Sequence, residues 1–241
     1  ANREPTRANI KDAAGDEDAT PKPERLNNLE LGYLYYSPRF SAGINGYYML
    51  YKDQLVPTGE KSDVGYDILT NVEDSYRLGM EIMTSWKPSA DWKWDMNATF
   101  SENRIVQFTE FVDTQSEVIE NSHIAYSPGI LVNSSLEWLP FERASIRLTG
   151  RYVGEQYYDN SSEEGALIDD YFLTDLTLGY SLDIPGMEDL DFRFRINNLL
   201  NQDIITNAYG GKYLDGGEEV RWSYYYPLAP VNFMAQVRLR F

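Results

Sequence analysis

Residues 232–241 read NFMAQVRLRF, and their side chains alternate between two chemical classes. One alternate set is apolar and consists of Phe233, Ala235, Val237, Leu239 and Phe241. The set between them is polar at most positions and includes Arg238 and Arg240. Successive side chains of a β-strand point to opposite faces of its sheet. This stretch is therefore predicted to be a strand with one apolar face and one positively charged face.

The same period-two alternation recurs along most of the chain. It is found at residues 29–36, 42–48, 77–86, 92–100, 130–138, 146–152, 176–183, 192–197, 222–226 and 232–241. These segments predict about ten strands, several of them longer than the usual five or six residues. The fold class predicted from them is all-β.

Two kinds of connection separate the predicted strands. Short turns that contain proline occur at residues 37–39, 87–89, 139–141, 184–186 and 227–230. Long, polar and acidic connections occur at roughly 53–75, 109–126, 155–170 and 203–219. This order predicts an antiparallel meander with all the short turns at one end. Successive prolines lie about 50 residues apart, as in propeller blades, but a blade needs four strands per repeat and two are found here.

The two faces of the predicted strands differ sharply in charge. The apolar faces of these segments contain no Asp, Glu, Lys or Arg. The opposite faces carry Glu30, Arg77, Glu81, Lys93, Asp95, Glu137, Arg147, Arg151, Asp183, Arg193, Arg195, Arg238 and Arg240. A soluble sandwich and an outer-membrane barrel both show alternation. The strand length, the aromatic residues near strand ends and the short turns at one end favour the barrel.

Composition excludes several other classes of protein. The 241-residue chain has a formal net charge of -17, which argues against nucleic acid as a partner. It has no cysteine, so disulfides and thiolate metal sites are ruled out. Its apolar runs are too short for a transmembrane helix.

Several short motifs occur in an order that is familiar from one protein family. They are REPTR at 3–7, PERLNNLELGY at 23–33, NGYYMLYKDQL at 45–55, RLGME at 77–81, SPG at 127–129, RINNLLNQ at 195–202 and the terminal Phe241. Together they resemble the C-terminal half of the barrel of a TonB-dependent outer-membrane receptor. The resemblance covers nearly the whole chain.

The resemblance implies a fold and a division of the chain. The antiparallel meander of about ten long strands would be part of a transmembrane β-barrel whose plug domain and first half are absent. Residues 1–26 would be the remnant of an extracellular loop, and residues 27–241 would be the C-terminal part of the barrel. An open sheet of this kind leaves two unpaired edges, which lipid does not tolerate.

The resemblance also implies a function. It predicts active uptake of a scarce nutrient, by default a ferric siderophore, with cobalamin or a glycan as other ligands. The partners it implies are the TonB energy-coupling complex, reached through the missing N-terminal part, the outer-membrane assembly machinery, lipid and lipopolysaccharide, and a small-molecule metal chelate. The location would be the outer membrane of a Gram-negative bacterium. Phe233, Val237, Leu239 and Phe241 would form the assembly signal of the last strand, with Phe241 at the periplasmic interface.

Four arginines on the polar face form a candidate site. Arg147, Arg151, Arg193 and Arg195 would either guide an anionic ligand through the lumen or form a charge ladder with acidic residues of neighbouring strands. The ladder is favoured, because opposite charges on adjacent strands stabilise each other. Its acidic members would be Glu30, Glu81, Asp95, Glu137 and Asp183.

Other candidate residues have simpler interpretations. His123 is the only histidine and is expected to be a rim or surface residue and not a metal ligand. The acidic residues of 155–170 either bind calcium or are solvated, and they lack the spacing of a dedicated calcium loop. No cofactor, catalytic motif or metal site is predicted, so the chain is not expected to be an enzyme.

Two alternative functions remain open from the sequence. The first is a complete ten-strand barrel enzyme of the omptin type, which uses Asp and His pairs at its rim; the lone histidine speaks against it. The second is a soluble β-sandwich that binds a ligand through its aromatic residues, which solubility without detergent would favour.

Overall fold

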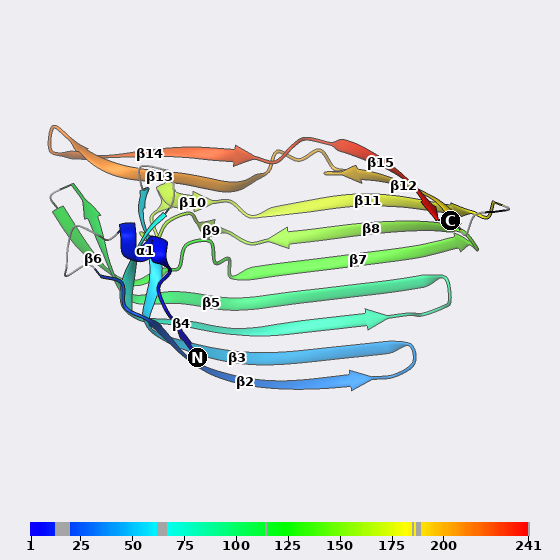
Figure 1. Cartoon of the computed structure of the whole chain (residues 1–241), viewed down its shortest axis with the longest axis horizontal. Coiled ribbons are helices and arrows are strands. Elements are labelled where there is room, and N and C mark those ends of the chain that lie inside the picture. Colours follow the sequence, from blue (N-terminus) through cyan, green and yellow to red (C-terminus); the bar gives the residue numbers. More distant parts are fainter. Residues whose placement is uncertain (13–19, 62–66, 114, 185, 187–188, 241) are drawn as a thin grey trace.

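The computed structural model describes residues 1–12, 20–61, 67–113, 115–184, 186 and 189–240. One antiparallel sheet of eleven strands dominates it (Figure 1). The strand order is β1-β2-β3-β4-β5-β7-β8-β11-β12-β15, and β6 pairs with β5 outside this path. The long strands follow one another in chain order, so the predicted all-β meander is confirmed.

Nine long strands form the body of the sheet. They are β2 (Glu24–Tyr36), β3 (Phe40–Lys61), β4 (Asp67–Trp86), β5 (Trp92–Val112), β7 (Ile130–Phe141), β8 (Ala144–Val153), β11 (Tyr171–Leu182), β12 (Asp189–Asn197) and β15 (Asn232–Arg240). The remaining elements are shorter or lie at one end. They are β1 (Asn2–Arg3), α1 (Arg7–Asp12), β6 (Gln115–His123), β9 (Gln156–Tyr157), η2 (Glu164–Ala166), β10 (Leu167–Ile168), β13 (Ile205–Asp215) and β14 (Glu218–Pro227). Neither helical segment in the described ranges has the length and apolarity to span a membrane.

The register aligns the apolar residues of neighbouring strands in rows. Leu136 of β7 lies opposite Leu148 of β8, and Leu148 lies opposite Leu176 of β11. The row continues through Ile196 of β12 to Phe233 of β15. A shift of one residue in any strand would move its apolar side chains to the other face, so the alternation itself fixes the register.

The apolar face of the sheet is exposed in the structure. Leu31 is 82% exposed and Leu148, in the middle of its row, is 41% exposed. The buried apolar residues lie instead at the end of the sheet opposite the short turns, in one cluster around Val56, Ile105 and Phe108 and a second around Tyr158, Ile168 and Ala208. A sandwich would bury this face against a second sheet, and no such layer occurs among the described residues.

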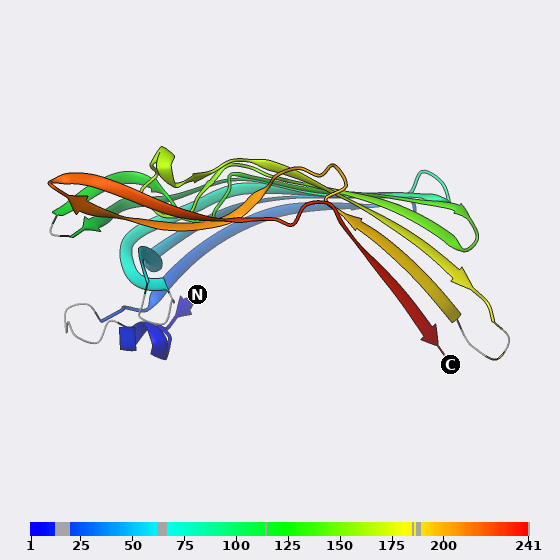
Figure 2. The same ribbon diagram turned by 90° about the horizontal axis from the view of Figure 1, so that it is seen from above.

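The long connections are more ordered than the sequence indicated. Residues 53–61 and 67–75 continue β3 and β4, and residues 115–123 form β6, which pairs with the end of β5. Residues 205–215 form β13 of a two-stranded sheet with β14. The prediction of loops in these places was wrong, because the strands continue as hairpins beyond the apolar rows. Figure 2 shows the twist of the sheet and the curling of the β3–β4 hairpin.

One predicted turn does not lie with the others. The turns at 37–39, 87–89 and 139–141 join strands at one end of the sheet, as expected. Residues 227–230 instead link the end of β14 to the start of β15, near the middle of the long axis and away from the short turns (Figure 1). The predicted aromatic strand at 222–226 is confirmed as part of β14, but it belongs to this separate hairpin. In the turn at 184–186, Pro185 lies outside the described residues.

Candidate functional site

The polar face of the sheet brings the four predicted arginines together. Arg147 and Arg151 lie on β8, and Arg193 and Arg195 lie on β12, with β11 between them. Thr177 of β11 is opposite both Arg147 and Arg195, so these two arginines lie at the same level of the sheet. The period-two pattern placed them on one face correctly.

Three of the four arginines have polar partners. Arg147 Nη2 lies 2.7 Å from Glu137 Oε1, which is one of the predicted acidic partners. Arg195 Nη2 lies 2.6 Å from Asp175 Oδ2, a partner that the sequence did not indicate. Arg151 Nε donates to Asn133 Oδ1 at 3.0 Å. Arg193 makes no ion pair within the described part of the chain.

The other predicted members of the ladder pair elsewhere. Asp183 contacts Arg143, and Asp95 lies 2.7 Å from Lys93. Glu30 accepts a hydrogen bond from Asn28 on its own strand. Glu30 and Glu81 lie on β2 and β4, several strands away from the arginines. The ladder is therefore a set of local pairs that leaves Arg151 and Arg193 without a carboxylate partner among the residues described.

Several cavities open on the polar face, and two of them are lined in part by these arginines. The larger, about 890 Å³, lies at the end with the short turns and is lined by charges of both signs, including Arg193, Arg238 and Asp191. The smaller, about 270 Å³, lies nearer the hairpins, between Arg151 and Arg195. Its lining consists of Thr149, Arg151, Leu173, Asp175, Arg195, Asn197, Asn198, Leu228, Ala229 and Asn232.

At the end opposite the short turns, four segments pack into one unit that we call the hairpin layer. It comprises residues 53–61 with 67–75, 104–112 with 115–126, 155–170, and 203–228. Segment 155–170 is its centre. Asn160 donates to the carbonyl of Pro57 at 2.7 Å and accepts from the N–H of Ala125 at 2.8 Å. The loops predicted at these positions are thus bonded to one another.

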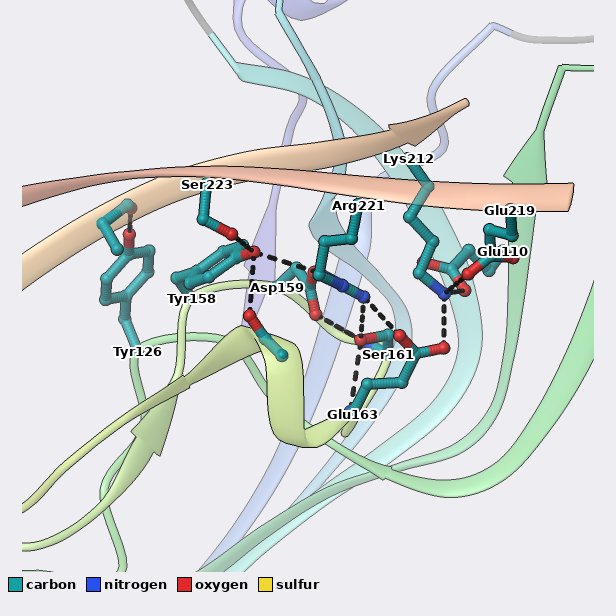
Figure 3. A network of polar contacts seen from close by, with 12 residues as sticks. Glu110, Tyr126, Tyr158, Asp159, Ser161, Glu163, Lys212, Glu219, Arg221 and Ser223 are labelled. Atoms are coloured by element: carbon teal, nitrogen blue, oxygen red, sulfur yellow. Dashed lines mark hydrogen bonds and ion pairs between the residues drawn. The ribbon is translucent and has the colours of Figure 1, made fainter. Parts of the chain in front are cut away.

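A buried polar network attaches the β13–β14 hairpin to this layer (Figure 3). Lys212 Nζ lies 2.8 Å from Glu110 Oε2 and 3.1 Å from Glu219 Oε1, and it also contacts Glu163. The Lys212 side chain is only 4% exposed. Burial lowers the pKa of Lys212, but the hydrogen bonds that its ammonium group donates to the three glutamates outweigh burial and raise the pKa above its ordinary value. The ammonium group is therefore held in its charged form.

Arg221 forms the second half of the network. Its guanidinium lies 2.8 Å from Asp159 Oδ2 and 2.6 Å from Glu163 Oε2. It also donates to the Tyr158 hydroxyl at 3.0 Å. Burial raises the pKa of Glu163, but hydrogen bonds from Lys212 and Arg221 outweigh it and lower the pKa below the ordinary value. Asp159 and Glu163 are therefore neutralised by side chains, and no group of three metal-binding residues is present among the residues described.

The sheet, its exposed apolar face and its hairpin layer agree with the result of a comparison with known families. Residues 6–199 match the family described as TonB dependent receptor-like, beta-barrel. The chain belongs to this family. The match covers the strands from β2 to β12.

Among proteins with curated descriptions, the chain is similar to pesticin receptors. It is 26% identical over 210 residues to that of Yersinia enterocolitica and 25% identical to that of Yersinia pestis. The alignments include 85% of this chain but 28% of the relative, so the chain spans little more than a quarter of their length.

Solved structures of low sequence identity share the fold. The ferric yersiniabactin uptake receptor FyuA from Yersinia pestis aligns with a TM-score of 0.62 at 20% identity, over 91% of this chain and 31% of the receptor. The siderophore receptor PiuA from Acinetobacter baumannii gives 0.68 at 12% identity, over 91% and 29%. The copper transporter OprC gives 0.71 at 16% identity, over 100% and 36%.

In this TonB-dependent receptor barrel, His123 is a structural residue of the hairpin layer. Its Nδ1 lies 3.1 Å from Arg104 Nη1 and 3.0 Å from Ser162 Oγ, and its ring lies 4.6 Å from that of Tyr157. Burial lowers the pKa of His123, and Arg104 lowers it further. No carboxylate among the described residues hydrogen-bonds to the ring, unlike the Asp and His pairing expected for a rim protease.

The face of the β13–β14 hairpin that points away from the polar network carries an aromatic cluster. The ring of Tyr209 lies 5.3 Å from Tyr224 and 5.8 Å from both Trp222 and Tyr226. The sequence pattern found the three aromatic residues of β14 but not Tyr209, which joins them through cross-strand pairing.

The residues predicted as an assembly signal lie on β15. Phe233, Val237 and Leu239 share its apolar face and are exposed, and β15 pairs only with β12 among the described strands. Phe241 lies outside the described residues. Sequence reasoning missed Asp175, Asn198, Lys212 and Arg221. For Lys212 and Arg221 one signal was available, because each is a lone basic residue beside the acidic run 215–219.

Proposed function

We propose that this chain forms part of the wall of an outer-membrane receptor that imports a scarce nutrient as a metal chelate, most specifically a ferric siderophore. The observation that carries the proposal is the exposed apolar face of a sheet whose other face is polar and rich in arginine. Lipid would cover the first face, and the solute would pass along the second. Membership in the TonB-dependent receptor family supports this arrangement.

The limits of the apolar face support a transmembrane position. At one end it carries Trp86, Trp92 and Trp138, and the rings of the last two stack 5.5 Å apart. At the other end the same face carries the ion pairs Lys52–Asp74 and Glu102–Arg104. The apolar stretch between these limits is about ten residues long, as a tilted strand needs to cross a bilayer. Tryptophan belongs at the headgroup level and ion pairs belong in water.

The same geometry supports the remaining partners. The hairpin layer would face the cell exterior, with lipopolysaccharide against the rim of Lys52, Asp74, Glu102 and Arg104. The free edge of β15 would pair with a barrel strand outside this chain, in line with the greater length of the relatives. The plug and the contact with the TonB energy-coupling complex would lie in that other part. Residues 27–241 would then be the C-terminal part of the barrel, with residues 1–26 belonging to an exterior loop.

The test is uptake of ⁵⁵Fe in a strain deleted for the complete gene. A panel of ferric chelates that differ in their iron-binding groups would be supplied to the deletion strain and to the complemented strain. We expect complementation to restore uptake of one chelate class, and we expect that uptake to require TonB and the proton-motive force. Equal uptake of every chelate with and without the gene would contradict an iron-chelate receptor.

A further inference from the structure

We propose that the 270 Å³ cavity on the polar face is a binding subsite for a carboxylate group of a solute. This inference rests on the proposed function, because it assigns a chemical preference to the transport wall. The cavity lies beneath the two ends of the β13–β14 hairpin, where Asn198 and the Leu228–Ala229 connection meet β8, β11 and β12.

Two arginines reach the cavity from opposite sides of β11. Arg151 of β8 is opposite Leu173 of β11. Two residues nearer the short turns, Thr149 of β8 is opposite Asp175 of β11. Arg195 enters from β12, on the other side of β11. The cavity therefore has a guanidinium group on each flank and the Asp175 carboxylate between them.

The negative charge of Asp175 is already neutralised by Arg195. Its Oδ2 accepts from Arg195 Nη2 at 2.6 Å, and its Oδ1 accepts from the N–H of Asn198 at 3.0 Å. Its side chain is only 14% exposed. The pair of Asp175 and Arg195 is thus neutral, and each oxygen of the Asp175 carboxylate already accepts one hydrogen bond.

Arg151 is the charge that remains uncompensated. Its one hydrogen bond to another described residue uses Nε, which donates to the neutral amide oxygen of Asn133. No carboxylate lies within ion-pair distance of Arg151 among the described residues. A guanidinium has five N–H donors in a planar fork, and four of them remain for a carboxylate, which it binds in bidentate fashion.

The rest of the lining matches a carboxylate that has a short carbon skeleton. Leu173, Leu228 and Ala229 give one apolar side to the cavity, and Thr149, Asn197 and Asn232 give polar groups. Small-molecule sites combine such apolar walls with a few placed polar groups.

The wall of the cavity is also held rigidly. The Asn198 side chain is 1% exposed, and its amide group bonds to the N–H and C=O of Gln202 at 3.0 and 2.9 Å. It also donates to the carbonyl of Ala229 at 3.4 Å. A site whose lining is fixed by such bonds loses little entropy when a ligand binds.

The direct test uses 4-bromobenzoate, whose carboxylate and ring match the two sides of the cavity and whose bromine scatters anomalously. Crystals of the complete receptor soaked with this probe should show a bromine peak in the cavity. In solution, isothermal titration of the detergent-solubilised receptor should give binding that Arg151→Gln weakens at least roughly tenfold. Arg151→Lys should weaken binding less, because it keeps the charge but loses the fork.

The matched control is Arg147→Gln on the same strand, whose guanidinium is already paired with Glu137. It should leave binding unchanged. A difference in gel mobility between unheated and heated samples would show that each variant forms a folded barrel. No bromine peak in the wild type, or equal affinity in Arg151→Gln, would overturn the subsite.

A carboxylate side chain from another part of the receptor is the other source of the same chemistry. If density in the unsoaked crystal shows an Asp or Glu against Arg151 and the probe does not bind, the subsite for solute is refuted. The proposed function is tested separately, by ⁵⁵Fe uptake of the wild type. Iron uptake without probe binding would refute the carboxylate subsite and leave the proposed function standing.

Discussion

Lys212 of β13 lies 2.8 Å from the carboxylate of Glu110 on β5, although 102 residues separate them in the sequence. In the sheet, β7, β8, β11 and β12 follow β5 before the chain reaches the β13–β14 hairpin. The contact joins β5 directly to that hairpin within the hairpin layer. Because Lys212 is almost fully buried, removing it would leave its carboxylate partners without a counter-charge, at a large cost in free energy. The β13–β14 hairpin is therefore held in the layer by this ammonium group together with the Arg221 guanidinium.

We predict that Lys212→Met releases the β13–β14 hairpin from the layer. The substitution leaves Glu110 buried without its cation, which costs roughly 3–5 kcal/mol of local stability. Hydrogen exchange of residues 205–227 should become fast while that of β7 and β8 is unchanged. The control is Lys93→Met, which removes an exposed pair with Asp95 and should leave exchange unaltered. Unchanged exchange in the Lys212 variant would show that Arg221 alone holds the hairpin.

Docking of the hairpin should also weaken at alkaline pH. The pKa of Lys212 is raised above its ordinary value of 10.5 in the folded layer. A raised pKa stabilises the docked state fully below 10.5, and this stabilisation is lost as the pH rises through the higher folded value. Because the chain has no cysteine, Asp215→Cys provides a single site for a nitroxide label. The label should become mobile only when the pH exceeds the raised pKa of Lys212 in the folded layer. Lys212→Arg should abolish the transition, since guanidinium stays charged; persistence of the transition would assign it to another group.

The two faces of β8 should respond differently to substitution. Leu148→Arg places a charge on the exposed apolar face and should cost about 2–4 kcal/mol if that face lies in lipid. Arg147→Leu removes an exposed pair with Glu137 and should cost about 0–1 kcal/mol. Reversible unfolding of the receptor in lipid vesicles measures both. Equal costs would argue against a lipid-covered face.

Asn198 should be essential for the join between the sheet and the β13–β14 hairpin. It is buried, hydrogen-bonded and held at a φ of 50°. Asn198→Ala loses these bonds and keeps the strain, at a cost of roughly 2–4 kcal/mol. Asn198→Gly relieves the strain alone, so it should recover part of the loss. Thermal unfolding of both variants tests this, and identical melting to wild type would show that water replaces the amide.

The apolar face of β15 should affect assembly more than stability. Leu239→Asp and deletion of Phe241 should lower the amount of receptor folded in the outer membrane, since assembly machinery adds strands by pairing with an exposed edge. Receptor that does assemble should melt within a few degrees of wild type. Heat-modifiable gel mobility of outer-membrane fractions measures the yield. The control is Gln236→Ala on the polar face, and an equal loss there would remove the specific role of the apolar residues.

The sequence by itself determined the sheet and its two faces. Alternation is a local property, because the side chains of any extended strand leave in opposite directions. Leu148 and Arg147 could therefore be assigned to opposite faces before any partner strand was known. The same alternation specified the register, since only one register keeps apolar residues beside apolar residues.

Only the tertiary structure decided which distant groups meet. Asp175, Asn198 and Lys212 show no periodic signal, and their partners are chosen by how the chain returns after long connections. The acidic connections at 109–126 and 155–170 looked like solvated loops because their charges are plain in the sequence, whereas Lys212 and Arg221, which neutralise Glu110, Asp159 and Glu163, lie far away along the chain. Charge pairing acts through space and not along the chain, so composition predicted a charged surface where the fold forms a buried network.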